Sequence, residues 1–410
     1  MQQLLNQQLF SHPMSRPIYI PTILLAFGRG LLLPVLPIYL LSLDISYTWV
    51  TFAIASMGMG TIVGDLPAGF LLGRLSAKKT MQLGIGSMGL ALLAMALIQS
   101  YWALVAFYFL VGVGTALYNI SRHFYLRSEV PLEQRGRAIA IFGGTNRIGT
   151  FAGPVIGGYL SLLFGPSGVF IVFALLAAVA YFFPTQYAVE RAPKPSEGTP
   201  TQGQMHNPLS SLRHLFQSNA EVLIPAGIGQ FFAQGVRSGR TVILPLYGAD
   251  VLGLDEVAIG WIMTIASGID MSLFYPAGLI MDRLGRKFAY VPSFLIQGIA
   301  MALIPFTTGF FGLAIVSGLM GFGNGLGSGS MMTLGADLAP TESTGEFLGI
   351  WRLIGDLGQT SAPIVVGNVA DIFNYLPYSA WVVAAMGIAS GLTFGWFVPE
   401  TLRRDREVKG

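Results

Sequence analysis

Long apolar stretches separated by short polar connections run along the whole chain. Residues 81–99, 102–119, 310–334 and 378–398 contain no charged side chain. About 20 consecutive apolar residues cross the hydrocarbon core of a bilayer as a helix. The pattern therefore predicts an all-α membrane protein. Its spans, about twelve by this criterion, lie at residues 18–41, 49–72, 81–99, 102–124, 138–163, 167–185, 221–246, 257–281, 289–308, 310–336, 346–370 and 378–399.

The second half of the chain repeats the first. Gly69 is matched by Gly278, and Pro154 by Pro363, both at an offset of 209 residues (278 − 69 and 363 − 154). In so apolar a chain this repeat predicts two pseudo-symmetric six-helix bundles, an arrangement found in many secondary transporters. We expect an N-terminal bundle at residues 1–184, a cytoplasmic linker at 185–219 and a C-terminal bundle at 220–410. Within the linker, residues 209–216 predict a short helix at the membrane interface.

Composition narrows the possible chemistry. Hydrophobic residues make up 53% of the chain and charged residues only 10%, against about a quarter charged in soluble domains. The chain has no cysteine, which excludes disulfides and thiolate metal sites. The four histidines form no ligand pair at helical spacing, so we expect no metal, no cofactor and no enzymatic activity. The net charge of +3 indicates orientation in a membrane rather than binding to nucleic acid.

The basic residues outside the spans fall on one side of the predicted membrane. The loops on the other side hold acidic residues such as Asp44, Asp250 and Asp255 and no lysine or arginine. The positive-inside rule then places both termini and the linker in the cytoplasm. Residues 1–17 lack the features of a cleaved signal peptide. We therefore expect a multi-pass protein of the cell inner membrane whose first helix is retained.

Eight charged residues lie inside predicted spans and away from the span ends, and each costs about 2.5–3.5 kcal/mol at a helix centre. Their depth suggests two ion pairs, Arg147–Asp270 and Asp65–Arg352. The alternative is that each charge reaches a water-filled cavity without a fixed partner. Burial can raise the pKa of an aspartate into the physiological range, so Asp270, Asp356 and Asp65 are candidate proton carriers. A structural salt bridge is the alternative for each. The eight residues are Arg29, Arg147, Arg237, Arg240, Arg352, Asp65, Asp270 and Asp356.

Two stretches resemble signatures of the major facilitator superfamily. Residues 278–287, GLIMDRLGRK, are similar to its gating loop, and residues 149–158, GTFAGPVIGG, match the helix 5 signature of its drug:proton antiporter branches. The resemblance covers essentially the whole chain and implies twelve helices and alternating access. It implies a gating loop of Gly278, Asp282, Arg283, Gly285 and Arg286 that faces Arg135 and Arg137. The helix 5 motif comprises Gly149, Gly153, Pro154, Gly157 and Gly158, and close helix packing without a transport role is its alternative interpretation.

The chain departs from the family pattern at two positions. In the first half, Gly73 stands where the gating loop carries an acidic residue. Tyr108 stands where the antiporter branches carry an arginine in helix 4. Proton coupling through that arginine is therefore excluded.

The resemblance also places symmetry-related arginines, Arg29 and Arg237, at the central cavity. Five arginines against three aspartates inside the spans favour a substrate with an anionic group. Other candidate cavity residues are Asn119, Asn146, Arg147, Gln230, Gln234, Asp270 and Asp356.

Our main interpretation is proton-coupled export of small amphiphilic molecules by a monomer in the lipid bilayer. The alternatives are an organic-anion or lipid exporter or facilitator without proton coupling, and a transporter-like sensor.

Overall fold

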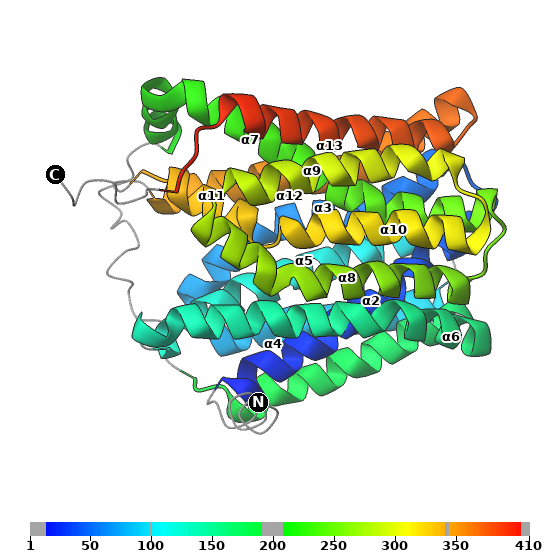
Figure 1. Cartoon of the computed structure of the whole chain (residues 1–410). Coiled ribbons are helices and arrows are strands. Elements are labelled where there is room, and N and C mark those ends of the chain that lie inside the picture. The colour runs from blue at the N-terminus through cyan, green and yellow to red at the C-terminus, as the bar shows by residue number, and fades with distance from the viewer. Residues whose placement is uncertain (1–13, 99, 131, 191–207, 341–343, 403–410) are drawn as a thin grey trace. The chain divides into compact units, whose positions relative to one another are not determined.

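The computed structural model describes residues 14–98, 100–130, 132–190, 208–340 and 344–402, with side chains excepted at residues 15, 132–143, 146 and 208–219. Within these ranges the chain is helical and has no strand (Figure 1). The elements are η1 (Ser15–Tyr19), α2 (Ile20–Leu41), α3 (Tyr47–Arg74), α4 (Ala77–Leu97), α5 (Tyr101–Glu129), α6 (Leu132–Tyr187), α7 (Pro208–Leu246), η2 (Tyr247–Val251), α8 (Glu256–Arg283), α9 (Lys287–Leu303), η3 (Ile304–Phe306), α10 (Gly309–Leu326), α11 (Ser330–Leu338), α12 (Thr344–Phe373) and α13 (Pro377–Phe397).

The predicted spans fall on helical segments, although the span 310–336 is broken. Two of them, 138–163 and 167–185, are the two arms of α6. Gly165 interrupts α6 with φ 70° and ψ 174°, a conformation that glycine adopts at little cost, and the chain folds back there (Figure 1). The described residues include nine helical stretches that are long and apolar enough to cross a membrane. The helices α7 and α12 are not among these nine, and they carry Arg237, Arg240, Arg352 and Asp356.

The predicted span 310–336 is interrupted rather than continuous. The helix α10 ends at Leu326 and α11 begins at Ser330, and Gly329 between them has φ 74°. The break leaves carbonyl groups without partners in the helix. The Gly327 carbonyl accepts hydrogen bonds from the Ser330 hydroxyl at 2.6 Å and from Arg237 Nη2 at 3.0 Å. An arginine from α7 therefore helps to satisfy the broken end of α10.

The chain divides into two compact units. Unit 1 comprises Met1–Thr199 and Pro245–Thr264, and unit 2 comprises Pro200–Leu244 and Ile265–Gly410. The segment Pro245–Thr264, which holds η2 and the first turns of α8, thus belongs with the first half of the chain.

Unit 1 is held together by close helix contacts. The helix α2 packs against α6, and α5 packs against both α3 and α4. A Cβ atom at Gly153 would lie 2.5 Å from the Gly30 Cα atom, and one at Gly84 would lie 2.6 Å from the Gly114 carbonyl oxygen. Small residues let membrane helices approach in this way.

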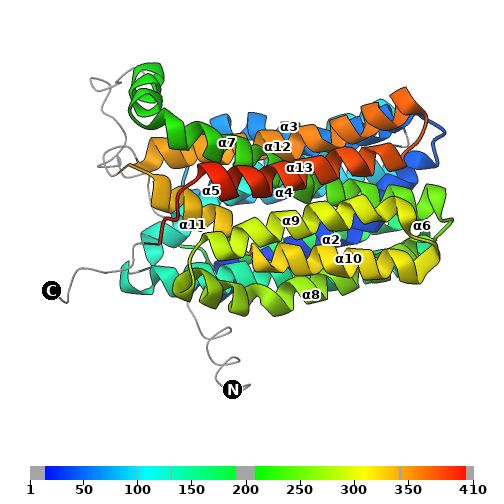
Figure 2. The same ribbon diagram turned by 45° about the horizontal axis from the view of Figure 1, so that its top comes forward.

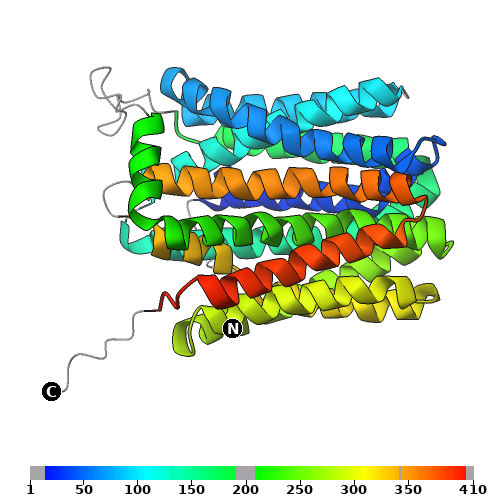
Figure 3. The same cartoon turned by 90° about the horizontal axis from the view of Figure 1, so that it is seen from above.

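Unit 2 is built on the same principle. The helix α9 packs against α13 and α10, and α9 and α13 lie side by side in Figure 2. A Cβ atom at Gly387 would lie 2.8 Å from the Gly298 Cα atom. The predicted helix at 209–216 forms the beginning of α7, whose first turns run across the direction of the rest of the helix (Figure 3).

Candidate functional site

Two arginines of unit 1 lie near one buried tyrosine. Tyr118 on α5 is 3% exposed, and its hydroxyl lies 3.0 Å from the Thr22 hydroxyl on α2. The Arg122 guanidinium lies 4.9 Å from the centre of the Tyr118 ring, and Arg29 on α2 is close enough to interact electrostatically with Tyr118. Two arginines from two helices therefore converge on one aromatic side chain, an environment that attracts an anionic group.

Arg29 also interacts electrostatically with Tyr108. Tyr108 occupies the α5 position at which the family resemblance implies an arginine. The guanidinium near this position thus comes from α2 instead of α5. The sequence identified both residues separately, but their proximity is a tertiary contact that no local pattern indicates.

Arg122 is a site residue that the sequence did not single out. It lies near the end of the predicted span 102–124, within α5, and is only 5% exposed. Arg122 is therefore a further buried arginine in unit 1.

The other candidates in unit 1 lie on separate helices. Asp65 on α3, Asn119 on α5 and Arg147 on α6 are all part-buried. The side chain of Asn146 lies outside the described residues. The pairs Arg147–Asp270 and Asp65–Arg352 each join one residue from each unit, and both pairs stay predictions.

In unit 2, Asp270 on α8 is part-buried beside an asparagine. The Asn324 amide, on α10, donates a hydrogen bond of 3.1 Å from Nδ2 to Asp270 Oδ2. An asparagine amide can donate to a carboxylate and, after rotation, accept from a carboxylic acid. The pair can therefore satisfy Asp270 in either protonation state. Asn324 was not among the predicted site residues.

Arg237 on α7 is engaged inside unit 2. Besides its bond to the Gly327 carbonyl, its guanidinium lies 5.2 Å from the centre of the Phe294 ring on α9. Its sequence counterpart Arg29 interacts electrostatically with Tyr118 and Tyr108 in unit 1, so the two symmetry-related arginines have different surroundings.

The remaining polar candidates in unit 2 lie where α7 meets α12. A Cβ atom at Gly355 would lie 2.7 Å from Gln230 Nε2 and 3.3 Å from Gln234 Cγ, so both glutamines face α12. One turn away along α12, Arg352 Nε lies 3.4 Å from Asp356 Oδ2. Asp356 is thus salt-bridged to Arg352, the residue for which the sequence suggested Asp65 as a partner.

The predicted gating loop forms an ionic network in unit 2. Arg286 Nη1 lies 2.7 Å from Asp282 Oδ1, and Arg286 Nε lies 3.2 Å from Asp337 Oδ2. The arginine therefore joins the end of α8 to the end of α11. Gly278 and Arg283 lie in the last turns of α8, and Gly285 has φ 135°, which requires glycine.

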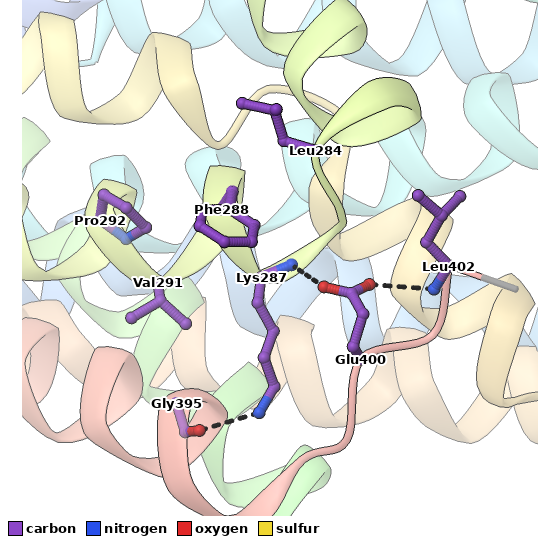
Figure 4. Close-up of a pocket in the computed structure, with 8 residues that line it drawn as sticks. All are labelled: Leu284, Lys287, Phe288, Val291, Pro292, Gly395, Glu400 and Leu402. Atoms are coloured by element: carbon purple, nitrogen blue, oxygen red, sulfur yellow. Dashed lines mark hydrogen bonds between the residues drawn. The ribbon is translucent and has the colours of Figure 1, made fainter. Parts of the chain in front are cut away.

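Glu400, which follows α13, completes this network. Its carboxylate accepts hydrogen bonds from the backbone N–H groups of Arg286 at 2.8 Å, Lys287 at 3.0 Å and Leu402 at 2.9 Å. Figure 4 shows Glu400 between Lys287 and Leu402 at a pocket of about 800 Å³. Lys287 Nζ donates to the Gly395 carbonyl at 2.8 Å. Glu400 thus caps the start of α9 and links it to the end of α13.

The network changes the pKa values of Arg286 and Glu400. Burial disfavours the charged form of Arg286, but hydrogen bonds to Asp282 and Asp337 outweigh it and raise the pKa of Arg286. Burial likewise acts to raise the pKa of Glu400, but the backbone N–H groups that it accepts from lower this pKa below the ordinary value of 4.5. Both groups are therefore held in their charged forms.

The predicted contact of Asp282 with Arg135 and Arg137 stays a prediction, because the side chains of these two arginines lie outside the described residues. Sequence reasoning missed Asp337 and Glu400. The sequence does show that Asp337 directly follows the predicted span 310–336 and that Glu400 directly follows the span 378–399.

The helix 5 motif lies in the first arm of α6 and has two contact faces within unit 1. Gly149, Gly153 and Gly157 face α2. On the other face, Gly158 meets the Glu256 carbonyl, and a Cβ atom at Gly260 would lie 2.5 Å from the Pro154 carbonyl oxygen. The Val155 N–H donates to Thr264 Oγ1 at 3.2 Å. The motif thus packs α6 against both α2 and the first turns of α8.

Two units of membrane-length helices with charged side chains inside them define a polytopic membrane protein of the transporter type. The family model of the Major Facilitator Superfamily matches residues 18–255 and 226–410. The chain therefore belongs to this superfamily, and its fold is the all-α fold that the sequence predicted.

Known proteins of different substrate classes resemble the chain. It is 23% identical over 369 residues to the "Multi-drug resistance efflux pump PmrA homolog" of Lactococcus lactis, covering 86% of each chain. It is 21% identical to the "Probable galactarate/D-glucarate transporter GudP" of Bacillus subtilis, covering 84% of this chain and 82% of the relative. The structure of a D-xylose-proton symporter superposes with a TM-score of 0.74 and 18% identity, covering 94% of this chain and 97% of the symporter.

Proposed function

We propose that this superfamily member is a secondary active transporter that exports small amphiphilic molecules by alternating access, driven by protons. The observation that carries the proposal is the Asp270–Asn324 pair, a carboxylate inside a membrane helix with a partner suited to both of its protonation states. Carboxylates inside membrane helices commonly serve proton relays. The proposed partners are protons and a small-molecule substrate, and the proposed state is a monomer.

Asp270 is favoured over the other two candidates as the proton carrier. The Asp270 carboxylate accepts a hydrogen bond from the Asn324 amide, which after rotation can also accept from the protonated acid. Asp356 forms a salt bridge with Arg352 on the same helix.

The direction of transport rests on the helix 5 motif and on the similarity to a drug efflux pump homolog. The motif packs α6 against the first turns of α8 within unit 1. We place the protein in the cell inner membrane with both termini in the cytoplasm, in agreement with the positive-inside rule.

A second candidate function is export or facilitated diffusion of organic anions without proton coupling. Arg29 and Arg122 around Tyr118 support it, as does the similarity to a probable galactarate/D-glucarate transporter. In this case the anionic group of the substrate binds near the arginines of unit 1, and the membrane aspartates serve as structural ion pairs.

Transport in proteoliposomes separates the two functions. The purified protein is tested with and without a pH gradient on a panel of amphiphilic dyes and organic anions that includes D-glucarate. Under proton coupling, Asp270→Asn loses accumulation against a gradient yet still exchanges substrate down its gradient. Asp44→Asn, at an exposed loop position, is the matched control and keeps full activity.

Unchanged gradient-driven transport in the Asn variants of Asp65, Asp270 and Asp356 would rule out proton coupling through these carboxylates. Loss of D-glucarate binding in Arg29→Gln, with the three Asn variants still binding it, would establish the organic-anion function instead.

A further inference from the structure

An apolar groove lies between α4 and the second arm of α6 in unit 1. It has a volume of about 500 Å³. Small residues form its floor: a Cβ atom at Gly89 would lie 3.4 Å from Ala177 Cβ, and one at Gly86 would lie 3.7 Å from the Tyr181 ring. The exposed side chains of Leu90 and Leu175 form its walls. The groove is therefore open along its length and lined almost entirely by hydrocarbon.

The groove has the length of an acyl chain segment. Its lining on α6 extends from Ile171 to Tyr181, which is about 15 Å of helix at 1.5 Å per residue. Tyr181 marks the end that is nearer to the start of α4.

Two polar side chains, Gln82 and Thr185, lie next to the groove at its Tyr181 end. Gln82 Nε2 donates to Thr185 Oγ1 at 2.8 Å, and Thr185 Oγ1 donates to the Tyr181 carbonyl at 2.7 Å. These side chains join α4 to α6 one turn beyond the apolar lining. They offer hydrogen-bonding groups between the apolar lining and the basic residues at the start of α4.

Basic residues lie beyond Gln82 and Thr185, at the start of α4. Lys79 Nζ lies 2.7 Å from Glu190 Oε1, and Lys78 is close enough to act electrostatically on the same carboxylate. The Arg16 guanidinium lies 5.0 Å from the centre of the Tyr187 ring on α6. The three cations exceed the charge of Glu190, and the positive end of the α4 dipole lies at Lys78. This end of the groove is therefore complementary to an anion.

We propose that this groove is a binding site for an anionic phospholipid. One acyl chain lies along Gly86 and Gly89, the glycerol ester region lies at Gln82 and Thr185, and the phosphate lies at Lys78. Basic clusters at the ends of membrane helices recognise anionic lipid head groups. Apolar, polar and basic groups follow one another along the groove in the order in which a phospholipid presents chain, ester and phosphate.

Native mass spectrometry of the full-length protein tests the site. The protein is extracted from bilayers of phosphatidylglycerol and phosphatidylcholine that carry identical acyl chains. We expect retained phosphatidylglycerol to fall about tenfold in Gly86→Leu/Gly89→Leu, a change that corresponds to about 1.4 kcal/mol. Gly69→Leu/Ala106→Leu, at exposed positions of α3 and α5, is the matched control and retains the lipid of the unmodified protein.

The head group is tested separately. Lys78→Gln should lower the ratio of phosphatidylglycerol to phosphatidylcholine while the total number of retained lipids stays the same. Phosphatidylglycerol with a photoreactive diazirine in its acyl chain should crosslink to residues 85–93 and 171–181.

Three outcomes would overturn the proposal. The first is equal lipid retention by the filled variant and the unmodified protein. The second is crosslinks that fall outside both segments. The third is a dimer mass that disappears in Gly86→Leu/Gly89→Leu, which would make the groove an interface between two copies of the chain.

Discussion

Glu400 joins the end of α13 to the start of α9 through three backbone N–H groups. Replacing it by glutamine removes the charge that these donors stabilise. We expect Glu400→Gln to lower stability at pH 7 by about 0.5–1 kcal/mol, the lower part of the range for capping residues because Glu400 is exposed. The apparent melting temperature of the detergent-solubilised protein measures the loss.

The stabilisation by Glu400 should depend on pH. The pKa of Glu400 lies below its ordinary value of 4.5, so its contribution is present above that value and is lost as the pH falls through the folded-state pKa. The difference between Glu400→Gln and the unmodified protein should therefore shrink on acidification from pH 7 to below pH 4.5. Glu190→Gln is the control, because Glu190 makes an exposed ion pair with Lys79 and should cost nothing measurable. A difference that persists at low pH would contradict the capping role.

Some contacts between single residues could not be predicted from the sequence. The position of Tyr108 and the presence of Arg29 in the first span were both readable from the sequence. Their proximity depends on how α2 packs against α5, which no local pattern encodes. Glu400 was missed for the same reason, since its partners Arg286 and Lys287 lie more than a hundred residues earlier.

The packing of α2 against α6 depends on glycine at the element scale. A Cβ atom at Gly153 would lie 2.5 Å from the Gly30 Cα atom, and backbone atoms cannot move away as a flexible side chain can. We expect Gly153→Ala to destabilise unit 1 by about 1–3 kcal/mol, as overpacking does. Gly144→Ala on the same helix has open space at the new methyl group and should be neutral or slightly stabilising. Thermal unfolding of both variants tests this, and equal melting temperatures would refute it.

The helices themselves were predictable because roughly twenty apolar residues have few other stable states in a bilayer. The interruption of the span 310–336 was not predicted. Mean hydropathy is insensitive to a short turn made of glycine and serine, and residues 327–329 are of these two types. The local signal was the run of alternating glycines from Gly325 to Gly329, which favours a break over a regular helix. The partner of the break, Arg237, comes from another helix and needed the structure.

At the scale of the whole molecule, the two sequence halves share a fold but differ in their polar chemistry. Unit 1 gathers arginines around Tyr118, whereas unit 2 contains the Asp270–Asn324 pair and the Arg352–Asp356 salt bridge. The repeat predicted the common fold because both halves keep the same glycines and prolines. It did not predict the difference, since substitutions at unmatched positions determine which side chains meet.

The orientation of the whole chain in the membrane is a prediction that cysteine labelling tests directly. All lysines and arginines outside the predicted spans fall on one side in sequence order, which places the linker in the cytoplasm. The chain has no native cysteine, so a single introduced thiol reports one position. Asp44→Cys and Asp255→Cys, both at exposed positions, should react in intact cells with a membrane-impermeant thiol reagent. Ser196→Cys in the linker should react only after the membrane is permeabilised. Labelling of Ser196→Cys in intact cells would show that the linker lies outside the cell. The predicted orientation would then be wrong, and so would the proposed direction of transport.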